Sequence, residues 1–202
     1  MHRRCGVVTR IHIVSLPHTL LTKAYDWCAY TAKVRRFVDM LILAGHQPIV
    51  YGPDVHDDVN PEAVYVPIVN AGDRKAWFGA EEWDITEVFN HWDSSHISWV
   101  TMNQRASAAI RERWQPEDVL GLIGGGCQQQ IISLLSELKP LTVEWGIGYS
   151  GVIPGTHRVY ESYAWAHHVA GFYRTDDVQF FDDVIPNCFD LNDFPFSNEP
   201  GS

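Results

Sequence analysis

The sequence predicts an α/β domain of the Rossmann-like, three-layer kind, with a mostly parallel sheet between two layers of helices. The first observation is a β-branched run, a helical repeat of apolar residues and a second apolar run, all within the first 51 residues. The second is a glycine run, 124–126, between a predicted strand and a predicted helix. The third is the order strand, glycine loop, helix, strand between residues 141 and 185. In sheets of this kind, ligands bind at the carboxyl ends of the strands.

The first strand is expected over Val7–Leu16, because β-branched residues dominate that stretch and Pro17 ends it. After a loop, Asp26 is the expected N-cap of a helix whose apolar residues recur at helical spacing. These residues are Tyr30, Val34, Phe37, Val38 and Leu41. Gly45 is expected to end the helix, and Gln47–Tyr51 is the second strand. Strand, helix and strand make one βαβ unit, which we expect to be right-handed.

The next part of the chain is harder to interpret. An acidic loop over 53–62 is expected at the surface, followed by a third strand over 63–69. Residues 70–100 show no clear pattern but contain four tryptophans: Trp77, Trp83, Trp92 and Trp99. Their rings either stack on sugar rings or anchor a long loop onto the core, and both alternatives stay open.

A central strand with a helix on each side is expected after this stretch. Thr101-x-x-Gln104 is a capping-box pattern, which predicts a helix that reaches about Trp114. The central strand is expected over Asp118–Ile123, where an apolar run leads into the glycine turn. A second helix is expected over Cys127–Leu138.

The last part of the chain predicts one more strand–helix–strand unit. An apolar run from Leu141 predicts a strand, and the glycines that follow allow sharp backbone turns: Gly146, Gly148 and Gly151. A helix is expected over Arg158–Ala170, and a short strand over Asp183–Ile185. We therefore expect one domain over residues 1–196, followed by a tail or the start of an interdomain linker over 197–202.

Charge and composition exclude several classes of protein. The formal net charge of −10 over 202 residues argues against binding to a nucleic-acid backbone, which needs a basic surface. No apolar run approaches the length of a membrane span, and no signal-peptide pattern opens the chain. The cysteines lie far apart without a CxxC pattern, which indicates reduced thiols in the cytoplasm. They are Cys5, Cys28, Cys127 and Cys188.

The glycine run lies in LGLIGGGCQQQ, which fits a dinucleotide-binding loop only in part. Gly124 and Gly126 fit, but Gln129 stands where a third small residue should pack. Either the backbone N–H groups at this helix start hold a phosphate or a sugar hydroxyl, or the glycines only make a tight turn. No HExxH or Asp-x-Asp pattern occurs, and the adjacent His167 and His168 cannot both face one metal from a helix. We therefore expect no metal site.

Five other side chains are candidates for chemistry. His18 and His157 are expected in loops at strand ends, where an imidazole can bind a sugar hydroxyl or exchange a proton. Glu144 ends an apolar strand, so that either burial raises its pKa or a basic partner holds it ionised. Arg158 and Glu161 lie three apart on a predicted helix. They either pair with each other, or bind a donor phosphate and orient a sugar.

A small-molecule hydrolase is another alternative. The tract Gly148-Tyr149-Ser150-Gly151 lacks the spacing of a nucleophile elbow, because Val152 occupies the last position. A hydrolase would need a serine or cysteine within reach of a histidine, and a covalent serine or thiol reagent would detect it.

Several segments together resemble one family of enzymes. VIPNCFDLNDF resembles the VIPNGVD signature that closes the N-terminal domain of two-Rossmann-domain (GT-B) glycosyltransferases of the group-1, family-4-like kind. The longer pattern VEWGIGYSG, HRVYESYAW and VIPNCFD is similar to a narrower set of phage and bacterial glycosyltransferases. SLPHTLLTKAYDWCAYTAKVRRF and LIGGGCQQ extend the resemblance over most of the chain.

The resemblance implies the acceptor-binding half of a metal-independent glycosyltransferase. In that architecture the N-terminal domain binds the acceptor, and a C-terminal domain holds the nucleotide-sugar across a cleft. It implies a nucleotide-sugar as co-substrate, no bound cofactor, and an acceptor that is a glycan, a protein or a small molecule. A separate C-terminal domain is an implied partner, and a homo-oligomer is compatible.

The residues that the resemblance places in the cleft fall into two groups. The candidate catalytic residues are Glu144 and Glu161, which the resemblance places in the cleft, and His157, which its expected position at a strand-end loop adds. The implied substrate-binding residues are His18, Thr19, Gly124, Gly125, Gly126, Cys127, Gln128, Gly146, Gly148, Tyr149, Arg158 and Ser162.

The chain also departs from the family pattern. Cys188 and Phe189 replace the Gly-Val of the broader signature, and no Glu-x7-Glu donor motif occurs. A non-catalytic module that binds a glycan or a protein is therefore a second interpretation of the same fold.

Overall fold

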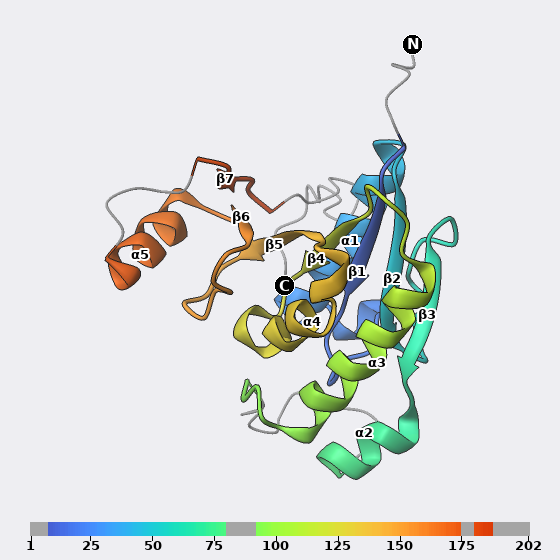
Figure 1. Ribbon diagram of the computed structural model, residues 1–202. Coiled ribbons are helices and arrows are strands. Elements are labelled where there is room, and N and C mark those ends of the chain that lie inside the picture. Colours follow the sequence, from blue (N-terminus) through green and yellow to red (C-terminus); the bar gives the residue numbers. More distant parts are fainter. Residues whose placement is uncertain (1–7, 80–91, 175–179, 188–202) are drawn as a thin grey trace, which may run out of the picture.

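The computed structural model describes residues 8–79, 92–174 and 180–187. Its centre is a seven-stranded sheet in the order β3-β2-β1-β4-β5-β6-β7, with every neighbouring pair parallel. The strands are β1 (Arg10–Val14), β2 (Gln47–Pro53), β3 (Val64–Val69), β4 (Val119–Leu122), β5 (Leu141–Ile147), β6 (His157–Tyr160) and β7 (Asp183–Val184). The α-helices are α1 (Ala29–Leu43), α2 (Ala71–Phe78), α3 (Ile97–Arg113), α4 (Gln129–Leu134) and α5 (Tyr163–Tyr173). The predicted Rossmann-like α/β class is confirmed (Figure 1).

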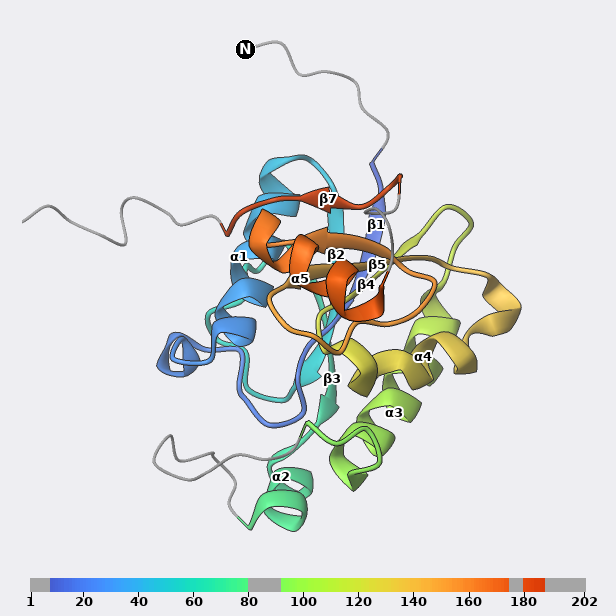
Figure 2. The same cartoon turned by 90° about the vertical axis from the view of Figure 1, so that its left-hand side faces the viewer.

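Helices cover both faces of the sheet, with α1 on one side and α3 and α4 on the other (Figure 2). This arrangement follows from the alternation of side chains along each strand. In β1, Ile13 belongs to one core cluster with Val34 and Val38 of α1, whereas Val14 belongs to a second cluster with Met102 of α3. All five side chains are fully buried. Burial of each one stabilises the fold by about 1.5–3 kcal/mol.

The first βαβ unit has the predicted order, but β1 is shorter than the predicted strand Val7–Leu16, β2 continues past the predicted end at Tyr51, and the start of the helix differs. Helix α1 begins at Ala29 with Cys28 as N-cap, so the prediction of Asp26 as N-cap is wrong. The Asp26 carboxylate instead accepts two hydrogen bonds from Arg35, at 2.6 and 2.7 Å. Gly45 follows the helix with a φ of 85°, the left-handed conformation that favours glycine at a helix end.

Helix α3 begins one turn before the predicted capping box. Its N-cap is His96, whose side chain accepts a hydrogen bond from the Ser98 N–H, and Thr101 lies inside the helix. The prediction of a helix start at Thr101 is therefore wrong. Trp99 and Met102 are both fully buried, and their burial stabilises the additional turn.

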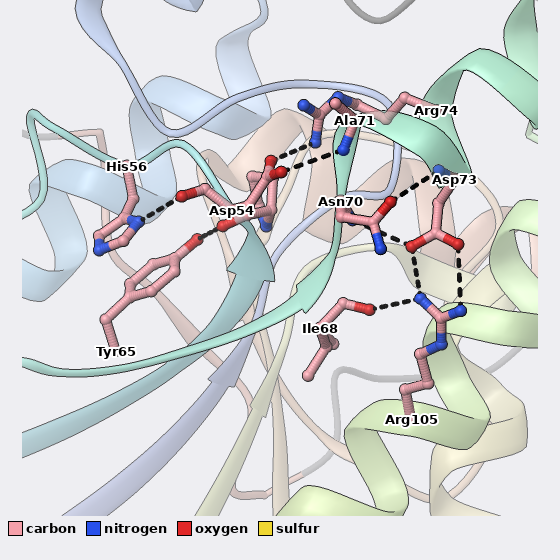
Figure 3. A network of polar contacts seen from close by, with 10 residues as sticks. Asp54, His56, Tyr65, Ile68, Asn70, Ala71, Asp73, Arg74 and Arg105 are labelled. Atoms are coloured by element: carbon pink, nitrogen blue, oxygen red, sulfur yellow. Dashed lines mark hydrogen bonds and ion pairs between the residues drawn. The ribbon is translucent and has the colours of Figure 1, made fainter.

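Helix α2 lies in the stretch that had no clear sequence pattern. Asn70 and Asp73 form a reciprocal capping box at its start. The Asp54 carboxylate, beyond the end of β2, accepts from the Ala71 N–H and from Arg74, whose side chain is 3% exposed (Figure 3). Burial raises the pKa of Asp54, but the hydrogen bond and charge of Arg74 outweigh it and hold the pKa below its usual value. These contacts fix α2 to the end of the sheet.

The charges on the other side of α2 also pair within the fold. The Arg105 guanidinium of α3 donates to both oxygens of Asp73 and to the Ile68 carbonyl (Figure 3). The hydrogen bond from Arg105 holds the pKa of Asp73 below its usual value. Asp73 thus connects the cap of α2 to α3, so we assign this network a structural role.

The helix predicted over Arg158–Ala170 is wrong at its start. Residues 157–160 form β6, where Arg158 pairs with Glu144 of β5 in parallel register. Helix α5 begins only at Tyr163, with the Ser162 hydroxyl accepting from the Trp165 N–H as the N-cap. Pairing of the HRVY backbone with β5 therefore overrides the helical pattern.

Smaller differences affect the remaining boundaries. The helix predicted over 127–138 is three short pieces: a 3-10 helix (Gly125–Gln128), α4, and a second 3-10 helix (Ser136–Leu138). Trp83, Cys5, Cys188, Phe189 and the predicted tail 197–202 lie outside the described residues. In the described part of the chain, no helix combines the length and apolar character needed to cross a membrane.

Candidate functional site

From β1 the chain adds β2 and β3 toward one edge of the sheet, and from β4 it adds the remaining strands toward the other edge. The two starting strands, β1 and β4, lie side by side at the centre, so the switch point of the sheet is between them. Ligands of open parallel sheets bind at the carboxyl ends of the strands at such a point. A cavity of about 450 Å³ lies here, beyond the ends of β4 and β5. Its described lining residues are Tyr30, Trp92, Ser94, Gly124, Gly125, Gly126, Cys127, Gln129, Tyr149 and Gly151. We call it the switch-point cavity.

Gln128 connects the ends of the two central strands beneath the cavity. Its Oε1 accepts from the N–H groups of Ile123 and Gly124, at 2.9 and 2.7 Å. Its Nε2 donates to the carbonyl oxygens of Val14 and Ser15, at 3.1 and 3.0 Å. The side chain is fully buried. Gln128, a predicted substrate-binding residue, therefore uses its amide within the fold.

Two further N–H groups of the glycine turn are also engaged. Gly126 N–H donates to the Gly151 carbonyl at 2.8 Å, and Cys127 N–H donates to the Gly124 carbonyl at 3.2 Å. Of the two alternatives for this run, the geometry favours a tight structural turn over a phosphate cradle. Gly125 has a φ of 55°, and a Cβ there would lie 2.6 Å from the Gly151 oxygen.

Aromatic rings form the walls of the switch-point cavity. Tyr30 of α1 lies 5.3 Å from Trp92 and 5.8 Å from Tyr149, between ring centroids. The core-anchoring interpretation is confirmed for Trp99, whereas sugar stacking by Trp92 stays a prediction. Trp99 is fully buried in the core, whereas Trp92 is 44% exposed and lines the cavity.

Glu144 lies fully buried behind the Tyr149 wall. It accepts hydrogen bonds from the Tyr149 hydroxyl and the Ile153 N–H, both at 2.8 Å, and lies 3.3 Å from the Thr156 hydroxyl. Burial raises its pKa to about 7, and these hydrogen bonds and the charge of Arg158 offset burial only in part. Glu144 therefore holds the loop that carries Tyr149, and its carboxylate does not line the cavity.

Glu161 is held by groups that come from distant parts of the chain. Its carboxylate accepts from Lys33 Nζ at 2.5 Å and from Asn187 Nδ2 at 3.0 Å. Burial raises its pKa, but the bonds from Lys33 and Asn187 outweigh burial and keep the pKa below its usual value. A Cβ on Gly148 would lie 2.2 Å from a Glu161 oxygen, so any larger residue there would displace the Glu161 carboxylate.

The Lys33–Glu161 pair lies close to the switch-point cavity. Lys33 Nζ is 5.0 Å from the centroid of the Tyr30 ring, and it also donates to the carbonyl of Gly146 at 3.0 Å. Arg158 does not contact Glu161 among the described residues and directs its Nη2 to the Ile153 carbonyl instead. The expected pairing of Arg158 with Glu161 is therefore not what the structure contains.

The other predicted residues lie outside the cavity lining. His18 and Thr19 are buried: the His18 ring lies edge-on to Trp92, and the Thr19 hydroxyl lies 2.6 Å from the Thr31 hydroxyl. His157 begins β6, and its ring contacts Phe181. Ser162 caps α5. Of the predicted set, Gly124, Gly125, Gly126, Cys127 and Tyr149 line the cavity.

Sequence reasoning missed Tyr30, Ser94, Gln129 and Gly151 as lining residues, and it missed Lys33 as the partner of Glu161. Tyr30 was assigned to the core by its helical spacing, because that spacing does not distinguish a core residue from one at the edge of a cavity. Lys33 is 128 positions from Glu161, and no local pattern signals such a contact.

A serine–histidine contact bears on the hydrolase alternative. Ser150 Oγ lies 3.1 Å from His168 Nε2 at an exposed position. No carboxylate of the described residues contacts His168 Nδ1, so the third group that orients a catalytic histidine is missing from this part of the chain.

The sequence was also compared with known proteins. No model of a protein family matches the chain, and no curated protein matches it significantly.

Proposed function

We propose that this chain is the acceptor-binding half of a glycosyltransferase of the GT-B kind. It would work with a nucleotide-sugar as co-substrate, held by a second, C-terminal domain. The observation that carries the proposal is the cavity at the switch point of the sheet, whose described lining is aromatic and uncharged. Aromatic rings pack against the apolar faces of sugar rings, and the carboxyl edge of the sheet is where ligands of this fold bind.

Catalysis in such a cleft depends on orienting the acceptor hydroxyl and on stabilising the departing diphosphate. Glu161 is the carboxylate that fits a role as base, because Lys33 and Asn187 keep it ionised beside Gly148. Glu144 would act as a positioning residue through Tyr149. The groups that bind the diphosphate would come from the second domain.

Reconstitution tests the proposal. The chain is mixed with a candidate C-terminal domain, UDP-glucose, UDP-galactose or GDP-mannose, and neutral oligosaccharide acceptors. Transfer is expected only when both polypeptides are present, and Glu161→Gln should lower it at least a hundredfold, as for loss of a general base. Glu137→Gln is the control, because Glu137 is an exposed glutamate paired with Arg111 on another part of the surface. Robust transfer by the isolated chain would overturn the half-enzyme proposal.

A non-catalytic glycan-binding module is the second candidate. The observation that favours it is that no carboxylate or histidine is among the described lining residues of the switch-point cavity. Sugar binding that survives Glu161→Gln, together with no transfer under any combination, would support the module. Labelling of Ser150 by a covalent serine reagent would instead support the hydrolase alternative.

A further inference from the structure

The switch-point cavity has no ionised side chain among its described lining residues. Its tyrosine, tryptophan, serine and glutamine side chains are uncharged at neutral pH. Its one thiol, Cys127, is also neutral, because burial raises the pKa of that thiol to about 11. The lining therefore offers no charge to balance a phosphate or a carboxylate.

Most backbone N–H groups of the glycine turn are also unavailable to an anion. Those of Gly124, Gly126 and Cys127 donate within the fold. The ammonium group of Lys33 is held by Glu161 and by a backbone carbonyl. An anion in the cavity would lose its hydration without gaining a partner of opposite charge.

The groups that the cavity does present suit a sugar. Tyr30, Trp92 and Tyr149 offer aromatic surface, and Ser94 and Gln129 are exposed polar side chains in the lining. A pyranose ring has an apolar C–H face and a rim of hydroxyl groups, so it can satisfy both kinds of surface. The volume of about 450 Å³ lies within the range of small-molecule pockets.

We infer that the switch-point cavity binds an uncharged pyranose ring of the acceptor by stacking, and that it discriminates against uronic acids and phosphorylated sugars. The inference rests on the proposed function and specifies its acceptor class. It also requires the phosphates of the nucleotide-sugar to bind outside this cavity.

Matched pairs of probes test the class of ligand. Methyl glucoside and methyl galactoside are compared with methyl glucuronide and methyl galacturonide, which differ from them by a carboxylate. Inorganic phosphate and uridine are tested in parallel, and binding is measured by saturation-transfer NMR and calorimetry. At least one neutral glycoside should bind at least tenfold more tightly than its uronide, and phosphate should not compete.

Two pairs of variants locate the binding. Trp92→Ala should weaken binding of the glycoside about tenfold, as for loss of one aromatic contact. Trp27→Ala is the control, because Trp27 is similarly exposed but is not among the lining residues. Gln129→Lys should raise the affinity for the uronide about threefold relative to the glycoside. Gln104→Lys adds the same charge on the exposed surface of α3 and should change neither.

Each outcome decides the inference. Equal or tighter binding of the uronides, competition by phosphate, binding of uridine alone, or no binding of any neutral glycoside at 50 mM would overturn it. Equal losses in Trp92→Ala and Trp27→Ala would overturn the location. Neutral sugar binding without transfer in the reconstituted system would sustain the inference and refute the proposed function. Transfer to an acidic acceptor alone would do the reverse.

Discussion

Replacing Glu144 with glutamine should make the protein more stable at alkaline pH. The carboxyl group is fully buried, and burial raises its pKa from 4.5 to about 7. A difference of this size corresponds to about 3 kcal/mol between the two protonation states. Glutamine has nearly the same shape and stays neutral, so Glu144→Gln removes the cost of burying the charge.

The sign follows from proton linkage. The folded protein binds this proton more tightly than the unfolded chain does, so the group stabilises the fold fully below pH 4.5. That contribution is lost as the pH rises from 4.5 to about 7. The Thr156 hydroxyl also lies 3.0 Å from the Ile153 carbonyl. When it donates to that carbonyl, it can accept a hydrogen bond from the protonated acid, which keeps the network complete below pH 7.

Urea unfolding between pH 4.5 and 8.5 measures the effect. The free energy of unfolding of Glu144→Gln minus that of the unmodified protein should increase by up to about 3 kcal/mol across this range. Glu137→Gln should leave the corresponding difference nearly constant, because Arg111 holds the pKa of Glu137 below its usual value and hence below this window. A constant difference for Glu144→Gln, or one that decreases with pH, would refute the reasoning. It would mean that Arg158 and the three hydrogen bonds hold the carboxylate ionised throughout.

Urea unfolding of three further variants tests other structural roles. Gly125→Ala should lower the free energy of unfolding by about 3 kcal/mol, because φ is left-handed there and the new Cβ would clash with the Gly151 carbonyl oxygen. Gly155→Ala is the control and should cost only about 1 kcal/mol, because φ is also left-handed but the space around it is open. Gln128→Ala should cost about 3 kcal/mol by leaving buried backbone groups unpaired, while Gln129→Ala should cost less than about 0.5 kcal/mol. Asn70→Ala should cost about 1 kcal/mol through loss of the α2 cap.

Local patterns predicted most of the fold. β-branched runs ended by proline or glycine located β1 and β2, and the helical spacing of Val34 and Val38 located α1. The same reasoning was wrong where pairing between strands decided the structure. The HRVY segment has a sequence that fits a helix, yet the neighbouring β5 supplies hydrogen-bonding partners that only an extended backbone can use. Tertiary contact outweighs local preference at such positions.

The candidate site was predictable only in part, because its members come from separate segments. The glycine run was found from the turn chemistry of glycine, which is a local signal, whereas Tyr149 was found through the family resemblance. Tyr30 comes from α1 and Trp92 from the stretch before α3, and their meeting with Tyr149 depends on the crossover order of the whole sheet. Residue type also misled: Gln128 and Glu144 carry polar groups suited to a substrate, but both use them to hold backbone.

The positions of the buried polar side chains decide which groups face the switch-point cavity. Gln128 accepts hydrogen bonds from backbone N–H groups at the start of the glycine turn, and Glu144 accepts one from the Tyr149 hydroxyl. Glycine backbone and aromatic rings are therefore the groups that face the cavity. Because the Tyr149 ring is already held by Glu144, its ordering would cost little conformational entropy if a ligand bound. The Lys33–Glu161 ion pair lies beside the cavity, with Lys33 Nζ 5.0 Å from the centroid of the Tyr30 ring. Among the described residues, the uncharged lining of the switch-point cavity and the Lys33–Glu161 pair are therefore separate features of this edge of the sheet.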